Sequence, residues 1–362
     1  MSDSADDGVG GVAPSIGNPR AHTVKVAQVI AETAEATTLV FDIPDDLLGR
    51  FAYRPGQFLT LRVPSERTGS VARCYSLCSS PHCDDRLAVT VKRTADGYAS
   101  NWLCDTLAAG DPITVLEPAG VFGPRDLNAD ALLCAGGSGI TPIMSIVKSM
   151  LAVGRGRITL LYANRDRGSA IFGAGLDELA RRHPGRLRVL SWLEAERGLP
   201  DARAVAALLR PHHRPEWYVC GPVGFTSVVR AAATALRVPP ARVHLEEYRS
   251  LVENPFETHC APATSDAPVG ASAVLEVDID GATHLLDWPK TERLLDVLLD
   301  KGIDAPYVCR ESACGTCVCS VRQGRTRMVH REALLDEEIA DGLTLACQTL
   351  PESARVHIAF DQ

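Results

Sequence analysis

Four cysteines near the C-terminus constrain this chain of 362 residues more than any other feature. Cys309, Cys314 and Cys317 have the spacing C-x4-C-x2-C, and Cys347 follows after 29 further residues. Three thiolates from one loop and a fourth from elsewhere are typical of a plant-type [2Fe-2S] site. Gly315 leaves room for amides of the loop to point toward such a cluster. We therefore expect residues 272–362 to form a small α+β domain that holds a [2Fe-2S] centre.

A structural zinc site is the alternative for these cysteines, because Zn²⁺ also accepts four thiolates, although zinc sites usually present two C-x2–4-C pairs. Disulfides are not expected. The N-terminus lacks the basic start and apolar stretch of an export signal, and the cytoplasm keeps thiols reduced. We expect a cytoplasmic protein with a disordered tail at residues 1–21. Cys319 should be a strand residue rather than a ligand.

The composition argues against two classes of function. No run approaches the roughly 18 apolar residues that a membrane-spanning helix needs. A net charge of −8 argues against a broad nucleic-acid-binding surface. Residues 272–362 carry 16 acidic and 9 basic side chains, so most of the negative charge lies there. This part should therefore prefer a positively charged partner.

Residues 22–127 predict an antiparallel β-barrel. Short runs of β-branched and apolar residues are separated by turn signals such as Pro55-Gly56, and such regular spacing is typical of barrels. The expected strands are 24–30, 37–43, 57–63, 72–77, 86–92 and 113–117, with one short helix near 98–107.

Residues 128–250 alternate apolar strands with helix-like stretches, which predicts βαβ units and a parallel sheet with ligands at the carboxyl ends of its strands. The expected strands are 131–134, 158–162, 187–192, 217–220 and 243–248. Pro, Ala and Ser in residues 251–271 indicate an interdomain linker.

The remainder, 272–362, should open with a hairpin whose Asp280-Gly281 turn favours type I′ geometry. A helix should follow from Thr291 to about Lys301, ended by Gly302.

A glycine-rich turn follows the first strand of the expected parallel sheet. Gly136-Gly137-Ser138-Gly139 lies between strand and helix, with Thr141 as a candidate N-cap and Pro142 as a first helical residue. Backbone amides there could hold a pyrophosphate at the helix N-terminus. Cys220-Gly221-Pro222 ends a later strand and would open the sheet edge for a nicotinamide. Close packing of helix and sheet would also account for such glycines.

Arg73-Cys74-Tyr75-Ser76 lies on an expected barrel strand, so Arg73 and Tyr75 share one face. A guanidinium can clamp a phosphate, and a phenol ring can cover a flat heterocycle. The same tetrapeptide could be an ordinary exposed strand. Further on, the stretch with Ser100 and Asn101 begins the short helix and offers a second anion site.

Taken together, the three parts resemble the ferredoxin-NADP reductase-type flavoprotein family with a plant-type ferredoxin domain at the C-terminus. The resemblance covers nearly the whole chain and implies an FAD-binding barrel, an NAD(P)-binding α/β domain and a β-grasp ferredoxin domain. More narrowly, VPSERTGSVARCYSLCSSP, AVTVKRTADGYASNWLCD, GSGITPIMSI and LLYANRD resemble the reductase components of actinobacterial 3-ketosteroid 9α-hydroxylases, which serve a Rieske oxygenase in steroid degradation.

The resemblance implies roles for individual residues. Arg73 would hold the FAD pyrophosphate, Tyr75 would stack on the isoalloxazine, and Ser76 would hydrogen-bond near flavin N5. Catalytic candidates are Ser76, Cys220 and Glu246. The other cofactor-binding candidates are Val91, Lys92, Ser100, Asn101, Gly137, Ser138, Thr141, Asn164, Arg165, Gly221, Pro222 and Tyr248. Two positions depart from the family pattern: Tyr248 stands where relatives carry Phe, and Ser312 stands where the cluster loop usually has Gly.

The implied function is an electron-transfer reductase. A nicotinamide would give a hydride to FAD, and the [2Fe-2S] centre would pass single electrons to a terminal oxygenase. A di-iron oxygenase, a desaturase or a cytochrome P450 could take the same electrons. A non-catalytic redox sensor is the alternative from another class. Arg165 and Arg167 could meet the 2′-phosphate of NADPH or be surface charges, but the resemblance favours NADH.

Overall fold

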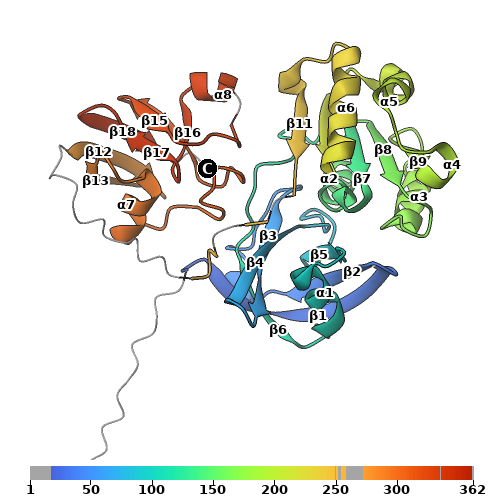
Figure 1. Ribbon diagram of the computed structural model, residues 1–362, viewed down its shortest axis with the longest axis horizontal. Helices are drawn as coiled ribbons and strands as arrows, with labels where there is room; N and C mark the ends of the chain where they lie inside the picture. The colour runs from blue at the N-terminus through green and yellow to red at the C-terminus, as the bar shows by residue number, and fades with distance from the viewer. Residues whose placement is uncertain (1–17, 249, 252–253, 258–271, 335, 361–362) are drawn as a thin grey trace, which may run out of the picture.

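The structure is a computed structural model and describes residues 18–248, 250–251, 254–257, 272–334 and 336–360. Most of the expected tail (1–17) and of the expected linker (252–253 and 258–271) lies outside the described residues. Three larger sheets and one two-stranded sheet build the described part of the molecule (Figure 1). None of the helices described is long and apolar enough to cross a membrane.

The first sheet is the expected antiparallel barrel. Its strands are β1 (Ala21–Thr33), β2 (Ala36–Asp42), β3 (Phe58–Ser65), β4 (Gly69–Ser76), β5 (Ala88–Lys92) and β6 (Pro112–Leu116). The order is β4-β3-β6-β1-β2-β5, and an antiparallel bridge between Leu77 and Val89 closes it. Alternate residues such as Leu39, Phe41 and Leu59 point into a buried core, as a period of two requires. The expected helix is α1 (Tyr98–Thr106), and a short turn η1 spans Asp45–Leu47.

The second sheet is parallel, also as expected. Its strands are β7 (Ala131–Gly136), β8 (Ile158–Asn164), β9 (Leu187–Leu193), β10 (Glu216–Cys220) and β11 (Val243–Glu246), in the order β11-β10-β7-β8-β9. The helices are α2 (Ile140–Val153), α3 (Gly173–Arg182), α4 (Glu194–Arg197), α5 (Ala202–Leu209) and α6 (Val223–Ala235). Short turns are η2 (Gly137–Gly139), η3 (Arg210–His212) and η4 (Pro240–Arg242).

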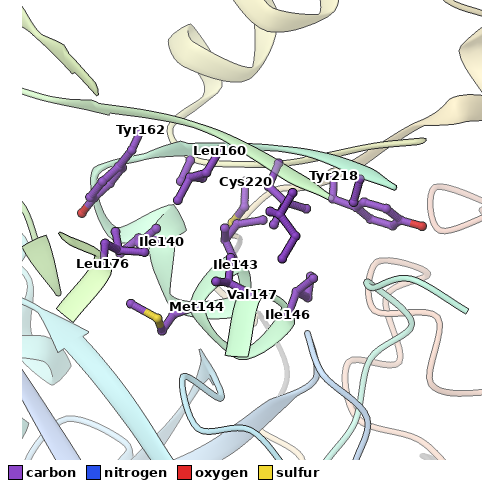
Figure 2. Close-up of a cluster of buried hydrophobic side chains, with 14 of the residues drawn as sticks. Ile140, Ile143, Met144, Ile146, Val147, Leu160, Tyr162, Leu176, Tyr218 and Cys220 are labelled. Atoms are coloured by element: carbon purple, nitrogen blue, oxygen red, sulfur yellow. The ribbon is translucent and has the colours of Figure 1, made fainter. Parts of the chain in front are cut away.

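Each face of this sheet has its own core. Figure 2 shows the core on the α2 side, where Ile143, Met144 and Val147 lie beneath the sheet residues Leu160 and Cys220. The opposite face packs against α5 and α6. Two details of the prediction are wrong: Thr141 is not the N-cap, and Pro142 is not the first helical residue. The turn η2 runs directly into α2, so the helix begins at Ile140, and the Thr141 hydroxyl donates to the Ser138 carbonyl at 3.2 Å.

The third sheet is mixed and lies in the C-terminal part of the chain. Its strands are β12 (Ser272–Ile279), β13 (Ala282–Pro289), β14 (Val318–Gln323), β16 (Leu343–Leu345) and β18 (Arg355–Ala359), in the order β13-β12-β18-β14-β16. A small sheet pairs β15 (Thr326–Met328) with β17 (Thr349–Pro351), and the helices are α7 (Leu294–Asp300) and α8 (Asp336–Ala340). Asp280 and Gly281 have φ angles of 50° and 76°, which fits the expected type I′ turn.

The C-terminal part packs against the barrel through a small apolar cluster (Figure 1 shows the two side by side). Phe58, Ala72, Leu116 and Ala119 come from the barrel, Phe256 comes from the segment between the second and third sheets, and Val308 precedes the cysteine loop. Cys74 on β4 and Cys314 in the cysteine loop both pack against this cluster. The contact brings the cysteine loop to the strand with the Arg-x-Tyr-Ser sequence.

Candidate redox-cofactor sites

Strand β4 carries a cation and an aromatic ring two residues apart, on one face. Arg73 and Tyr75 pair with Leu61 and Leu59 of β3, and Tyr75 packs against the barrel core. Burial raises the pKa of the Tyr75 phenol well above its usual range, so the ring stays neutral. Arg73 donates to the Ala72 carbonyl at 2.7 Å, and within the described part of the chain no carboxylate forms an ion pair with it. A guanidinium that no carboxylate neutralises suits a phosphate ligand.

The side chains of the candidate phosphate-binding residues stabilise the start of helix α1. The Ser100 hydroxyl accepts from the Thr94 amide at 3.1 Å, and Asn101 donates to the Gly97 carbonyl at 2.9 Å. Both side chains therefore hold the turn at the positive end of the helix, where an anion is favoured. Nearby, Val91 is fully buried in the barrel core, which leaves only its backbone for a cofactor.

The loops after β7 and β10 meet at the carboxyl edge of the parallel sheet. Here the strand order reverses, since the chain runs outward through β8 and β9 and returns on the other side of β7. A Cβ atom at Gly139 would lie 2.1 Å from the Cys220 carbonyl oxygen, and one at Gly221 would lie 3.0 Å from the Gly136 nitrogen. Backbone therefore packs on backbone here, and a side chain at Gly139 or Gly221 would prevent this close packing. The crevice that they border is where ligands bind in open α/β sheets.

Thr141, Cys220, Glu246 and Tyr248 converge at this edge. The Tyr248 hydroxyl lies 3.0 Å from the Thr141 hydroxyl and donates to the Ser138 carbonyl at 3.2 Å. Its hydroxyl also hydrogen-bonds the buried Cys220 thiol. The ring of Tyr248 is only partly covered, with 45% of the residue exposed. The hydroxyl is thus fixed while a ring face stays open for a flat partner. Pro222 is the N-cap residue of α6 beside this group.

Glu246 is the most perturbed carboxyl group of the site. Burial raises its pKa from 4.5 to about 8, and its Oε2 atom is buried without a hydrogen-bond partner among the described residues. Neutral near pH 7, this carboxyl group can donate a proton in a hydrogen bond. A buried acid with an unused oxygen at a ligand crevice is a functional-site candidate.

Asn164 ends β8 at the same edge of the sheet, and Arg165 follows it. The Asn164 side chain is buried, and its Oδ1 atom has no partner within the described part of the chain. Arg165 instead forms an ion pair with Glu35 of the β1–β2 turn, at 2.5 Å. The same carboxylate lies 3.9 Å from Lys92, whose ammonium also approaches Gly137. Glu35 therefore links the barrel to the parallel-sheet part.

The four cysteines of the C-terminal part meet as two pairs. The Cys309 thiol hydrogen-bonds the Cys314 thiol, and Cys317 hydrogen-bonds Cys347. No group of three or more His, Cys, Asp or Glu residues in the described ranges is arranged to hold a single metal ion. Two pairs of thiols fit a cluster of two irons, each bound by two thiolates, better than one zinc ion that needs all four at one point.

Backbone amides surround these sulfur atoms. The Glu311 amide donates to the Cys309 sulfur at 3.4 Å, and the Ser312 amide donates to the Cys347 sulfur. Gly315 has a φ of 69°, and a Cβ there would lie 2.9 Å from Val121 of the barrel. Amides directed at thiolates stabilise the negative charge of an iron–sulfur cluster, so the residues present fit that group. Cys319 lies in β14, as expected, and bonds the Thr344 carbonyl.

Two features of the site are absent from the sequence interpretation. Cys74 contacts the same apolar cluster as Cys314, although 240 positions separate them. Buried Glu117 binds Arg20, His22 and Arg50 at the barrel edge that faces the C-terminal part. Neither has a local sequence signal, because each depends on segments far apart in the chain.

A barrel whose strand β4 suits a phosphate ligand, a parallel sheet with a crevice at its switch point and a thiol loop packed on the barrel define a flavin- and iron–sulfur-dependent reductase. Three family models match in the corresponding order. They are the oxidoreductase FAD-binding domain (residues 23–123), the oxidoreductase NAD-binding domain (133–231) and the 2Fe-2S iron-sulfur cluster binding domain (277–352).

Two curated relatives bear the same description, "3-ketosteroid-9-alpha-monooxygenase, ferredoxin reductase component". The protein from Mycobacterium tuberculosis is 53% identical over 94% of this chain and 96% of its own length. That from Rhodococcus rhodochrous is 48% identical over 94% and 97%. The chain belongs to the family of these ferredoxin reductase components. Among solved structures, phthalate dioxygenase reductase has the same fold, with a TM-score of 0.54, 23% identity and coverage of 94% and 98%.

Proposed function

We propose that this chain is the reductase of a 3-ketosteroid 9α-monooxygenase, which takes electron pairs from NADH and supplies single electrons to a Rieske-type terminal oxygenase in the cytoplasm. The identity of about half to the two curated reductase components supports the steroid system. The structural observation that carries the proposal is the packing of Cys314 and Cys74 on one apolar cluster, directly behind the strand of Arg73 and Tyr75.

When bound, FAD would accept a hydride's electron pair and release it one electron at a time to the [2Fe-2S] cluster. The four thiolates of Cys309, Cys314, Cys317 and Cys347 would hold the irons. Arg73 would bind the FAD pyrophosphate, and Tyr75 would cover the isoalloxazine. Ser76, the last residue of β4, would place its buried hydroxyl near flavin N5. The start of α1, with Ser100 and Asn101, would bind the second phosphate.

The crevice between β7 and β10 would take the nicotinamide nucleotide. The η2 turn, with Gly137 and Ser138, and the Gly221-Pro222 turn would line it. Thr141 and Cys220 would position the Tyr248 hydroxyl so that the ring covers the flavin. Neutral Glu246 would donate a hydrogen bond toward the nicotinamide or flavin edge, since its Oε2 atom has no other partner in the described residues.

NADH is the proposed donor rather than NADPH. Of the two arginines that could meet a 2′-phosphate, Arg165 is already paired with the Glu35 carboxylate. A phosphate would have to displace that carboxylate and would meet its negative charge. Comparing kcat/KM for the two nucleotides tests this assignment.

Reconstitution with purified terminal oxygenases tests the function. With the 3-ketosteroid oxygenase, NADH oxidation should be coupled to 9α-hydroxylated steroid. Cys314→Ser should abolish product and the cluster's visible absorption, yet keep NADH-dependent dye reduction, because the barrel and parallel sheet do not depend on that thiol. Cys83→Ser, at an exposed thiol, should change neither.

Three results would contradict the proposal. Coupled turnover only with a di-iron oxygenase, a desaturase or a cytochrome P450 would reassign the partner. Absence of any NADH-driven dye reduction in FAD-loaded protein would favour a redox sensor. Loss of both activities in Cys314→Ser would show that the redox sites do not work separately.

A further inference from the structure

Ser312 has a backbone conformation that is energetically unfavourable for a serine. It lies in the loop between Cys309 and Cys314, and its φ is 61°, in the left-handed region that favours glycine. Only 1% of the residue is exposed, so solvation of the side chain does not explain why a serine stands there.

Both backbone groups of Ser312 are fixed. Its amide donates to the Cys347 sulfur, and its carbonyl accepts from the Ala333 amide at 2.9 Å. The backbone of Ser312 is therefore held beside the Cys347 sulfur. Yet its Oγ atom is buried without a hydrogen-bond partner among the described residues. A buried, unsatisfied hydroxyl is unfavourable and rare in folded proteins, so a partner from outside the polypeptide is indicated.

We propose that the Ser312 hydroxyl donates a hydrogen bond to a sulfur atom of the [2Fe-2S] cluster and raises the cluster's reduction potential. The inference rests on the cysteine ligand set of the proposed function. Cluster sulfurs are acceptors, and hydrogen bonds to them are among the factors that set the potential. Reduction adds one negative charge, so a donor stabilises the reduced form more than the oxidised form. The cluster then draws electrons from the flavin more readily.

Two substitutions separate the hydroxyl from the backbone conformation. Ser312→Ala removes the hydroxyl and keeps a Cβ at positive φ, whereas Ser312→Gly removes both the hydroxyl and the strain. Ser353→Ala is the matched control, because that hydroxyl already accepts from the Arg325 amide at 2.9 Å. The holoproteins are titrated anaerobically, with iron and sulfide content measured first and the cluster potential followed by electron paramagnetic resonance.

Both Ser312 variants should lower the potential by the same amount, equivalent to a roughly tenfold change in the one-electron equilibrium, about 59 mV. Both should also lose one exchangeable-proton coupling from the spectrum of the reduced cluster, while Ser353→Ala retains it. An unchanged potential in Ser312→Ala, or a shift confined to Ser312→Gly, would overturn the proposal in favour of backbone strain. If Ser312→Ala fails to hold a cluster, an unchanged potential and coupling in Ser312→Gly overturn it equally. Wild-type protein without iron and sulfide would instead refute the cluster site itself.

Discussion

Burying the Glu246 carboxyl group costs free energy, and the burial leaves one of its oxygens available to a ligand. Its carboxyl group is buried at the end of β11, with one oxygen unpartnered in the described residues, and burial raises its pKa to about 8. In the unfolded chain the same group titrates near 4.5. Between these two pH values the folded protein holds a proton that the unfolded chain has released. The free energy of unfolding therefore falls as the pH rises through this window.

Glu246→Gln should remove that pH dependence. The variant and the wild type should have similar melting temperatures near pH 4.5. As the pH rises, the free energy of unfolding of the variant should come to exceed that of the wild type, by roughly 3 to 5 kcal/mol above pH 8. Thermal unfolding of the holoprotein from pH 5 to 9 measures this, with Glu66→Gln, at an exposed glutamate between β3 and β4, as the control. A difference that stays constant with pH would show that Glu246 is ionised in the folded protein.

Arg73→Ala should weaken FAD binding by about 10- to 100-fold, which corresponds to the loss of one charge-assisted contact of about 1.5 to 3 kcal/mol. Equilibrium titration of deflavinated protein with FAD measures the change. Arg62→Ala is the control, because Arg62 lies on the paired strand β3 and donates to Ser70. Equal FAD affinity in Arg73→Ala and the control would remove Arg73 from the phosphate site.

At the scale of whole elements, the chain's periodicity predicted every strand of the barrel and of the parallel sheet. These strands are apolar because they line large buried cores, so their signal is local. The start of α2 was less predictable: Thr141 and Pro142 suggest a cap, but the η2 turn at Gly137–Gly139 runs directly into α2. The cysteine loop was predictable because the cluster's geometry fixes the ligand spacing.

The β1–β2 turn supplies an element-scale prediction about coenzyme choice. Glu35→Gln should free Arg165 and raise the NADPH-to-NADH ratio of kcat/KM by up to about fivefold. The effect is small because the ion pair is exposed, and such pairs contribute about 0.2 to 1 kcal/mol. Steady-state kinetics with both nucleotides measure it. Glu35→Gln combined with Arg165→Ala should not show the gain, and a gain in that double variant would mean that Glu35 acts through another cation.

At the scale of the whole molecule, contacts between the barrel and the C-terminal part could not be predicted. Glu117, whose side chain is only 6% exposed, binds Arg20 and His22 at 2.9 Å and also binds Arg50. Arg50 in turn lies 3.7 Å from Asp304, which follows α7 in the C-terminal part. No periodicity or spacing connects these positions. Their association depends on how the folded parts dock, which is tertiary information.

Docking of the C-terminal part should therefore depend on Glu117. Glu117→Gln leaves the surrounding cations uncompensated, which should cost about 3 kcal/mol, because one partner of a buried ionic group is removed. Since Arg50 would no longer be held toward Asp304, the cysteine loop should pack less tightly against β4. NADH should still reduce the flavin at the wild-type rate, while stopped-flow absorbance should show slower reduction of the cluster and solution scattering a larger radius.

Asp130→Asn is the control for this experiment. Asp130 also forms an ion pair, with Arg157, but that pair is exposed, with 76% of the arginine side chain accessible. That variant should lose less than about 1 kcal/mol and keep the wild-type rate of cluster reduction. A Glu117→Gln protein with unchanged cluster reduction and radius would mean that the apolar contacts of Phe58, Phe256 and Val308 hold the two parts together without the ionic group. The separation of the redox centres would then be set by packing alone, and salt should leave the internal electron-transfer rate unchanged.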